Sequence, residues 1–193
     1  MHFSGFLKFH SGGKIDYAIG IPTTIIAMIG GYLGANTLLL IPETLLDKLV
    51  GVFLLLILPT FLLDKDMGIV EGKTISRGRK SIGYIVFFLI GFWGAFFGGG
   101  FAFFATYAYI LLFGQTFLQC AGTKMVLGLG IAVISILIYG AYGAVNWTYG
   151  ITLISGECLG AYLGATVALK KGSKWIKIIF IFMVIFSSIK LIV

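Results

Sequence analysis

Residues 13–35 read GKIDYAIGIPTTIIAMIGGYLGA, and residues 143–165 read GAVNWTYGITLISGECLGAYLGA. The two stretches align without a gap at an offset of 143 − 13 = 130 residues. Identical or similar residues recur along the whole alignment, which pairs Gly13 with Gly143, Asp16 with Asn146, Tyr17 with Trp147, Gly20 with Gly150, and Gly30, Tyr32, Leu33, Gly34 and Ala35 with Gly160, Tyr162, Leu163, Gly164 and Ala165. A series of this length predicts an internal repeat.

The composition around the repeat is typical of an integral membrane protein. The chain has 193 residues, of which 59% are hydrophobic and only 11% are charged, whereas about a quarter of the residues of a soluble domain are charged. A helical span needs about 20 apolar residues, so a chain of this length crosses a bilayer roughly seven or eight times. We therefore expect an all-α, polytopic transmembrane helix bundle with no separate soluble domain.

Apolar runs of helical length predict about seven segments, at 18–41, 45–63, 81–97, 101–113, 119–142, 148–169 and 175–193. The run at 101–113 is short for a span and follows three glycines, so a half-helix, a re-entrant piece and a full crossing all stay open. Residues 1–10 lack the apolar core and cleavage site of a signal peptide, and we expect His10 to lie in a loop.

The repeat also predicts how the chain is divided. It continues without a gap from 45–63 onto 175–193 and ends with the chain. Residues 64–193 then form one complete unit, and residues 1–63 form the C-terminal portion of a first unit whose opening helices are missing. Two equal units would give a protein of about 260 residues, so we expect an N-terminally incomplete chain. Alternatively, a homodimer partner or another complementing chain supplies the missing half.

The formal net charge of +7 comes from basic residues that lie between the apolar runs. This is the pattern of the positive-inside rule, and it does not indicate a nucleic-acid partner. The basic connectors 64–80 and 170–177 are therefore expected on the cytoplasmic side of a cell membrane, plasma or inner, that the chain crosses several times. The bilayer itself is the first expected partner.

Charge also distinguishes two ways of arranging the repeat. The connector at 42–48 carries Glu43, Asp47 and one lysine, whereas its counterpart at 170–177 carries four lysines. Equivalent loops would then face opposite sides, which favours an inverted repeat with five crossings per unit. If 101–113 is re-entrant, the number of crossings is even and the repeat is parallel.

Candidate binding residues gather near the middle of the chain. Gly98, Gly99 and Gly100 leave backbone N–H groups unhindered, and a half-helix that starts there directs its positive end at mid-membrane, which suits an anion. Close helix packing explains the same glycines equally well. Lys124 follows Gly122 and Thr123 at the start of a long helix, so its ammonium and the Thr123 hydroxyl are candidates to bind an oxyanion. A lysine snorkelling to the interface is the alternative.

Other polar residues are weaker candidates. Glu157 lies within an apolar segment, where an ionisable side chain is costly; it is a candidate for proton coupling or for pairing with Lys124, or a neutral structural residue. Gln115 and Gln119 lie in the connector before Lys124. Asp16 and Asn146 are expected to cap helices. For Gly30 with Gly34, and for Gly160 with Gly164, we favour helix packing.

Two further groups of observations concern chemistry. Cys120 and Cys158 lie in apolar stretches without CxxC spacing, so we expect small buried side chains and no disulfide or metal site. The sequence has no HExxH, GxSxG or Walker-type motif and no paired carboxylates within a membrane segment. We therefore expect no enzymatic activity and no cofactor.

The order of several motifs resembles the sulfite exporter TauE/SafE family of permeases, also called the toluene sulfonate uptake permease family, over essentially the whole chain. The motifs are a glycine run, an Ala-Gly-Thr element, a turn before an aromatic residue and a Gly-x-x-x-Gly-Ala helix ending, formed here by Gly91, Gly94, Gly98, Gly99 and Gly100; Ala121, Gly122 and Thr123; Gly143, Val145, Asn146 and Trp147; and Gly160, Gly164 and Ala165. The family commonly has a proline about five residues after the glycine run, where this chain has Ala105 and Thr106.

The resemblance implies a secondary transporter for a small, sulfur-containing anion such as sulfite or an organosulfonate, with alternating access at the interface between the repeats. A non-transporting fragment, or a subunit that completes a partner membrane protein, is the alternative. Substrate identity, direction of transport and coupling ion do not follow from the sequence.

Overall fold

A computed structural model describes residues 2–38, 68–69, 76–96, 98, 100–143 and 145–192. These residues are helical with short connections and contain no strand, which confirms the all-α prediction. The helices are α1 (His2–Ser11), α2 (Tyr17–Leu38), α4 (Arg77–Phe96), α5 (Phe101–Phe113), α6 (Phe117–Ala141) and α7 (Trp147–Ile192). Within this part of the chain, α2, α4, α6 and α7 are long and apolar enough to cross a membrane. The segment predicted at 45–63 lies outside the described residues.

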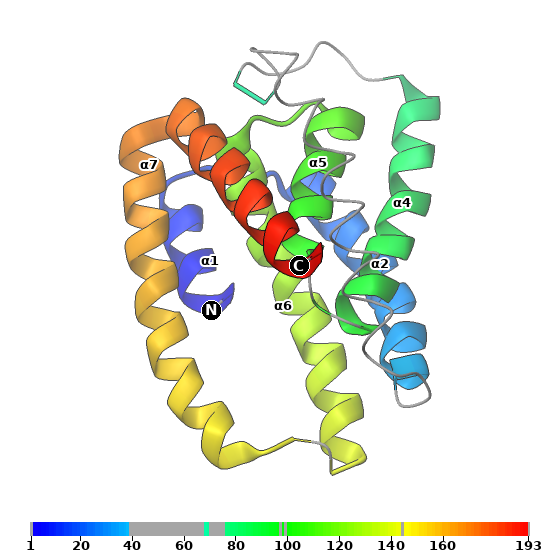
Figure 1. The fold of residues 1–193 in the computed structure, drawn as a ribbon. Coiled ribbons are helices and arrows are strands. Elements are labelled where there is room, and N and C mark those ends of the chain that lie inside the picture. The colour runs from blue at the N-terminus through cyan, green and yellow to red at the C-terminus, as the bar shows by residue number, and fades with distance from the viewer. Residues whose placement is uncertain are drawn as a thin grey trace.

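Helix α7 combines two of the predicted segments. Its backbone leaves helical geometry at Gly172, where φ is 76° and ψ is −175°, a conformation that glycine adopts without steric cost. Figure 1 shows the chain reversing its direction there, between the orange and red parts of α7. The predicted boundary between 148–169 and 175–193 is thus confirmed, although the helix is nearly continuous across it.

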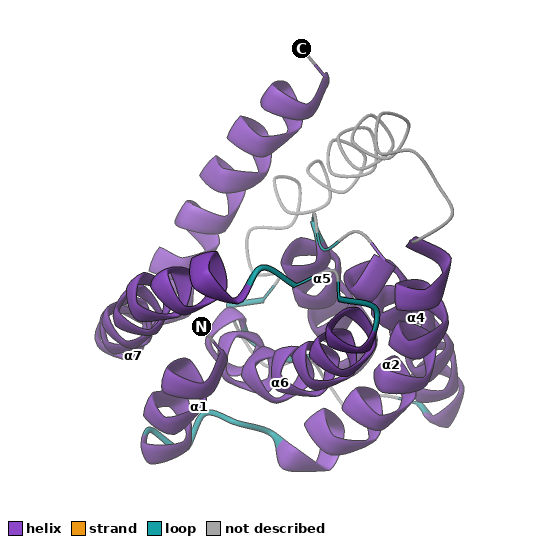
Figure 2. Cartoon of the chain, turned by 90° about the horizontal axis from the view of Figure 1, so that it is seen from below, coloured by secondary structure: helices purple, strands orange, loops and turns teal. Residues whose placement is uncertain are grey.

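Helix α6 is the centre of the bundle. It contacts α1, α2, α4, α5 and α7, and Figure 2 shows it lying between the α1–α7 side and the α2–α4 side. The buried core along it includes Leu127 and Cys120, neither of which is exposed. The free cysteine Cys120 is buried, as expected, whereas the free cysteine Cys158 is only partly buried.

The half-length helix α5 is fixed to α2 by a buried hydrogen bond. The hydroxyls of Tyr109 on α5 and Thr23 on α2 are 2.9 Å apart, and neither residue is exposed. Phe87 of α4 packs on Tyr109 with ring centroids 4.4 Å apart. Because an unpaired buried hydroxyl is costly, this pairing helps to determine where α5 lies.

Helices α2 and α4 pack backbone to backbone. A Cβ atom built on Gly34 would lie 2.8 Å from the Phe92 carbonyl carbon, and one built on Gly30 would lie 3.0 Å from the Phe88 carbonyl carbon. Packing was therefore the correct expectation for this pair of glycines. For the equivalent residues of α7, Gly160 and Gly164, the expectation of helix packing was wrong within the described part of the chain. There, no atom lies within 4 Å of a Cβ atom built on either glycine.

The two repeat copies share the geometry of one turn. Gly13 and Gly143 both have positive φ, at 62° and 66°, the left-handed region that favours glycine. Each N–H donates to the carbonyl three residues earlier, at 3.0 Å to His10 and 3.1 Å to Gly140. The sequence match therefore corresponds to a match in backbone structure.

The next residues of each copy confirm the predicted caps. The backbone N–H of Ile19 donates to Asp16 Oδ1 at 3.1 Å, and that of Tyr149 donates to Asn146 Oδ1 at 3.3 Å. Both are N-cap interactions, which satisfy an amide that has no partner within the helix.

The equivalent helices of the two copies run in opposite directions. In Figure 1, α2 runs from the upper end of the bundle to the lower end, whereas the first part of α7 runs from the lower end to the upper. Helix α5 runs antiparallel to α4 and α6, so the directions alternate along α4, α5, α6 and the two parts of α7. This arrangement agrees with the inverted form of the repeat.

Helix α1 was not predicted, and His10 lies at its end instead of in a loop. The helix forms because it packs between α6 and α7. Phe9 is only 3% exposed and packs with Ala165 and Ala168. Tertiary packing thus stabilises a helix that is too short to be stable alone.

Candidate functional site

The glycine turn between α4 and α5 forms the first part of the site. Gly98 and Gly100 each have φ of 74°, so both need glycine for their backbone conformation. The Gly100 carbonyl accepts hydrogen bonds from the N–H groups of Phe103 at 2.9 Å and Phe104 at 3.1 Å. Among the described residues no side chain caps the start of α5, so the positive end of this helix dipole has no side-chain cap at the turn. Gly99 lies outside the described residues.

A cavity of about 290 Å³ lies beside this turn. Backbone and small side chains form much of its wall. The lining residues are His2, Gly94, Gly98, Gly100, Phe101, Ala102, Phe103, Gly128, Ile131 and Ala132. None of these residues is a carboxylate, so the described wall of the cavity does not repel an anion.

His2 is a part of the site that the sequence did not indicate. Its ring lies against α6 at Gly128, where a Cβ atom would be 2.7 Å from His2 Cγ. His2 Nδ1 is buried and has no hydrogen-bond partner among the described residues. A histidine at the start of an unpredicted helix gave no periodic signal, so only the packing of α1 reveals its position.

Lys124 extends from α6 to the first turns of α5. Its Nζ donates to Thr106 Oγ1 at 2.8 Å and to the Ala102 carbonyl at 3.4 Å. Ala102 lines the cavity, and Gly128 lies one helical turn beyond Lys124 on α6. The ammonium group and the positive end of α5 are thus brought to the edge of the same cavity.

Thr106 is the second residue that sequence reasoning missed. It is 2% exposed, and its hydroxyl donates to the Ala102 carbonyl at 2.7 Å while accepting from Lys124. The available signal was its position, since Thr106 stands close to where the family commonly has proline. Proline has no hydroxyl and no N–H, so this departure changes the local chemistry.

Gly122 and Thr123 face away from the cavity. The Thr123 hydroxyl accepts the backbone N–H of Asp16 at 3.2 Å, and Thr123 is completely buried. A Cβ atom on Gly122 would lie 2.9 Å from the Lys14 carbonyl carbon. In this structure the Ala-Gly-Thr element holds the loop between α1 and α2, and the structure does not bring these two residues to Lys124 Nζ.

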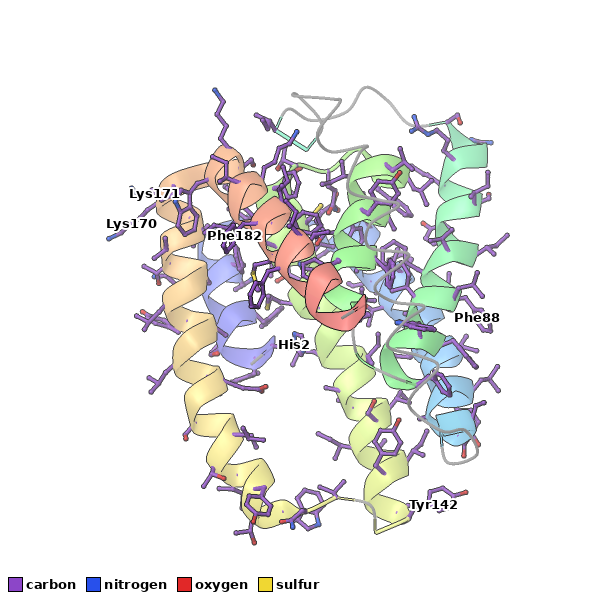
Figure 3. The ribbon with its side chains drawn as sticks, viewed as in Figure 1. His2, Phe88, Tyr142, Lys170, Lys171 and Phe182 are labelled. Atoms are coloured by element: carbon purple, nitrogen blue, oxygen red, sulfur yellow. The ribbon has the colours of Figure 1, made fainter. Side chains whose placement is uncertain are left out.

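The remaining candidates lie around the site. Glu157 is on the exposed part of α7. Burial lowers the pKa of the His2 ring, the charge of Glu157 opposes this shift, and that of Lys124 adds to it. The hydroxyl of Ser4 on α1 donates to the Cys158 carbonyl at 2.9 Å, next to Glu157. Figure 3 shows the labelled His2 on the side of α1 that faces the interior of the bundle.

The two glutamines occupy different environments: Gln115 lies in the α5–α6 connector as predicted, whereas Gln119 lies in the first turn of α6 and not in the connector. Gln119 forms a capping box with Thr116 at the start of α6. Gln115 is 3% exposed, and neither its amide nitrogen nor its amide oxygen has a hydrogen-bond partner within the part of the chain that the structure describes. Neither side chain lines the cavity.

Comparison with known proteins gives two matches. The family model described as sulfite exporter TauE/SafE matches residues 1–191. The chain is 27% identical over 189 residues to the "Probable membrane transporter protein ORF9" of Sinorhizobium sp, in an alignment that covers 97% of this chain and 72% of that relative. No solved structure matches the chain. The chain thus belongs to the sulfite exporter TauE/SafE family of membrane transporters.

Proposed function

We propose that the chain transports a small sulfur oxyanion, of the sulfite or organosulfonate type, and binds it in the cavity at the glycine turn. The observation that carries this proposal is the position of Lys124 Nζ, 2.8 Å from Thr106 Oγ1 at the first turns of α5. An ammonium has three N–H donors. Thr106 and the Ala102 carbonyl accept two of them, which leaves the third for a substrate oxygen.

The rest of the cavity suits the same ligand. The start of α5 adds the positive end of a helix dipole, which favours a negative charge in the cavity. Oxyanions accept several hydrogen bonds, and charged donors give the strongest ones. The substrate class rests on the family name, while the preference for an anion rests on Lys124 and α5.

Alternating access would use the inverted repeat. The opposite directions of α2 and the first part of α7 support a mechanism in which the two copies exchange roles on the two sides of the membrane. In this scheme Glu157 is the candidate for proton coupling. Its charge raises the pKa of the His2 ring, against the lowering caused by burial. The basic connectors 64–80 and 170–177 would face the cytoplasm.

Flux of radiolabelled sulfite into proteoliposomes tests the proposal. We expect Lys124→Ala to abolish flux, because it removes the ammonium donor at the cavity edge. Thr106→Val should reduce flux, because it removes the hydroxyl that accepts from Lys124 Nζ and holds it in place. Lys170→Ala is the matched control, since this exposed lysine lies on α7 far from the cavity. Unchanged flux in Lys124→Ala, with normal expression, would remove Lys124 from the site.

A second candidate function is that of a subunit that completes a partner membrane protein. The supporting observation is the surface of α7 around Gly160 and Gly164, which none of the described residues covers, whereas α4 covers the repeat equivalents on α2. A transmembrane helix of a partner chain would fit against these glycines, as α4 packs against Gly30 and Gly34 of α2. If such a helix binds, Gly164→Leu should abolish flux without lowering the stability of the isolated chain; unchanged flux would argue against a partner at this surface.

A further inference from the structure

A second hollow, separate from the glycine-turn cavity, lies between α4 and α5. This groove has a volume of about 480 Å³ and an almost wholly apolar surface. Its lining includes Val86, Leu89 and Trp93 of α4 and Ala108 and Leu111 of α5. It shares no residue with the lining of the glycine-turn cavity. The volume is in the range of pockets that hold small ligands.

The groove is long and open to the bilayer. From Val86 to Trp93 the lining extends along α4 for about 10 Å, at 1.5 Å per residue. Leu89 is 58% exposed and Leu111 is 36% exposed, so the side of the groove is accessible to lipid. An elongated apolar hollow parallel to the spans has the shape of an acyl-chain site.

A guanidinium group lies at one end of the groove. Arg79 Nη2 donates to the Leu111 carbonyl at 2.6 Å, and Leu111 lines the groove. This contact uses one of the five N–H donors of the guanidinium. Arg79 is otherwise exposed, and the remaining donors match the oxygens of a phosphate.

The neighbouring charges favour an anion at the same place. Arg77, Arg79 and Lys80 all lie in the first turn of α4, which has no acidic residue. Basic side chains at the N-terminus of a helix are repelled by the positive end of the helix dipole and by one another. A bound phosphate group would relieve this repulsion.

We propose that the groove holds an acyl chain of an anionic phospholipid, with the lipid phosphate bound by Arg79. The apolar wall selects for the chain, and the basic turn selects for the headgroup. Each basic residue near an anionic lipid surface contributes about 1 kcal/mol, which corresponds to about a fivefold change in affinity. A zwitterionic lipid fits the groove equally well but gains much less from Arg79.

Fluorescence quenching by brominated lipid tests this site. The sequence has three tryptophans, so a variant with Trp147→Phe and Trp175→Phe reports on Trp93 alone. In nanodiscs, phosphatidylglycerol with brominated acyl chains should quench Trp93 half-maximally at about a fivefold lower mole fraction than brominated phosphatidylcholine. Arg79→Gln should remove the difference, whereas Lys171→Gln, at the same end of the bundle but on α7, should retain it.

The groove itself is tested by a matched pair of substitutions on α4. Val86→Phe fills it and should abolish the preference for phosphatidylglycerol, whereas Ile85→Phe, at a position that is 64% exposed and outside the lining, should not. If a variant fails to fold, native mass spectrometry of the wild type should show phosphatidylglycerol retained over phosphatidylcholine.

Three results would overturn the proposal. Equal quenching curves for the two lipids would mean that Trp93 senses only bulk lipid. A lack of quenching would mean that another part of the chain fills the groove. If Arg79→Gln retained the preference for phosphatidylglycerol, the lipid headgroup would not be bound by Arg79.

Discussion

The tight crossing of α2 and α4 permits a direct comparison between two equivalent glycines. Gly34→Ala introduces a Cβ atom 2.8 Å from the Phe92 carbonyl carbon. Carbon atoms normally approach to about 3.5–4.0 Å, so this contact requires the helices to separate by at least about 0.7–1.2 Å, and the Phe92 carbonyl oxygen lies closer still to the same Cβ atom. A gap of about this size removes a quarter to a half of the dispersion energy of each neighbouring contact, including the contacts at Gly30 and Gly91.

The expected cost of Gly34→Ala is about 1–3 kcal/mol, the usual range for overpacking. Gly164→Ala adds the same methyl group at the equivalent position of α7, where no described atom lies within 4 Å. It should therefore be neutral, or stabilising by up to about 1 kcal/mol through helix propensity.

Reversible unfolding in detergent, followed by intrinsic fluorescence, measures both free energies. A difference of about 1–4 kcal/mol between the two variants is expected. Equal stability of Gly34→Ala and wild type would refute the close approach of α2 and α4. Destabilisation by Gly164→Ala would show that the surface of α7 is covered in the folded chain.

Two further predictions concern topology and the position of α5. In a variant without native cysteines, Tyr142→Cys should react with an impermeant maleimide on intact cells and Lys171→Cys only after lysis, because the two residues lie at opposite ends of the bundle; the reverse pattern would invert the proposed orientation. Thr23→Val should leave the buried Tyr109 hydroxyl without its 2.9 Å partner and lower the unfolding free energy by about 0.6–2 kcal/mol; an unchanged free energy would mean that the hydroxyl finds another acceptor.

Much of the fold was predictable because it depends on local chemistry and on periodicity. Apolar runs of span length gave the helices, and the matched turns at Gly13 and Gly143 followed from an aligned glycine. The caps at Asp16 and Asn146 needed only a short polar side chain before a helix. Each of these features is determined within a few residues of its own position.

The parts that were missed depend on contacts distant in sequence. Helix α1 is stabilised by α6 and α7, so its own ten residues gave little sign of it. The side chains of Thr123 and Lys124 are adjacent in sequence, yet one binds the loop before α2 and the other binds α5. Adjacent residues on a helix point about 100° apart, and only the neighbouring helices decide which one reaches a cavity.

The shortness of α5 has an electrical consequence. Its 13 residues extend about 20 Å at 1.5 Å per residue, or roughly two-thirds of a hydrocarbon core about 30 Å thick. A univalent anion that enters from the basic end and stops at the start of α5 would cross roughly two-thirds of the membrane potential. At about 2.3 kcal/mol per charge per 100 mV, its binding energy would change by about 1.5 kcal/mol for each 100 mV. Occupancy of the cavity is thus expected to respond to voltage about tenfold per 100 mV, before any conformational step.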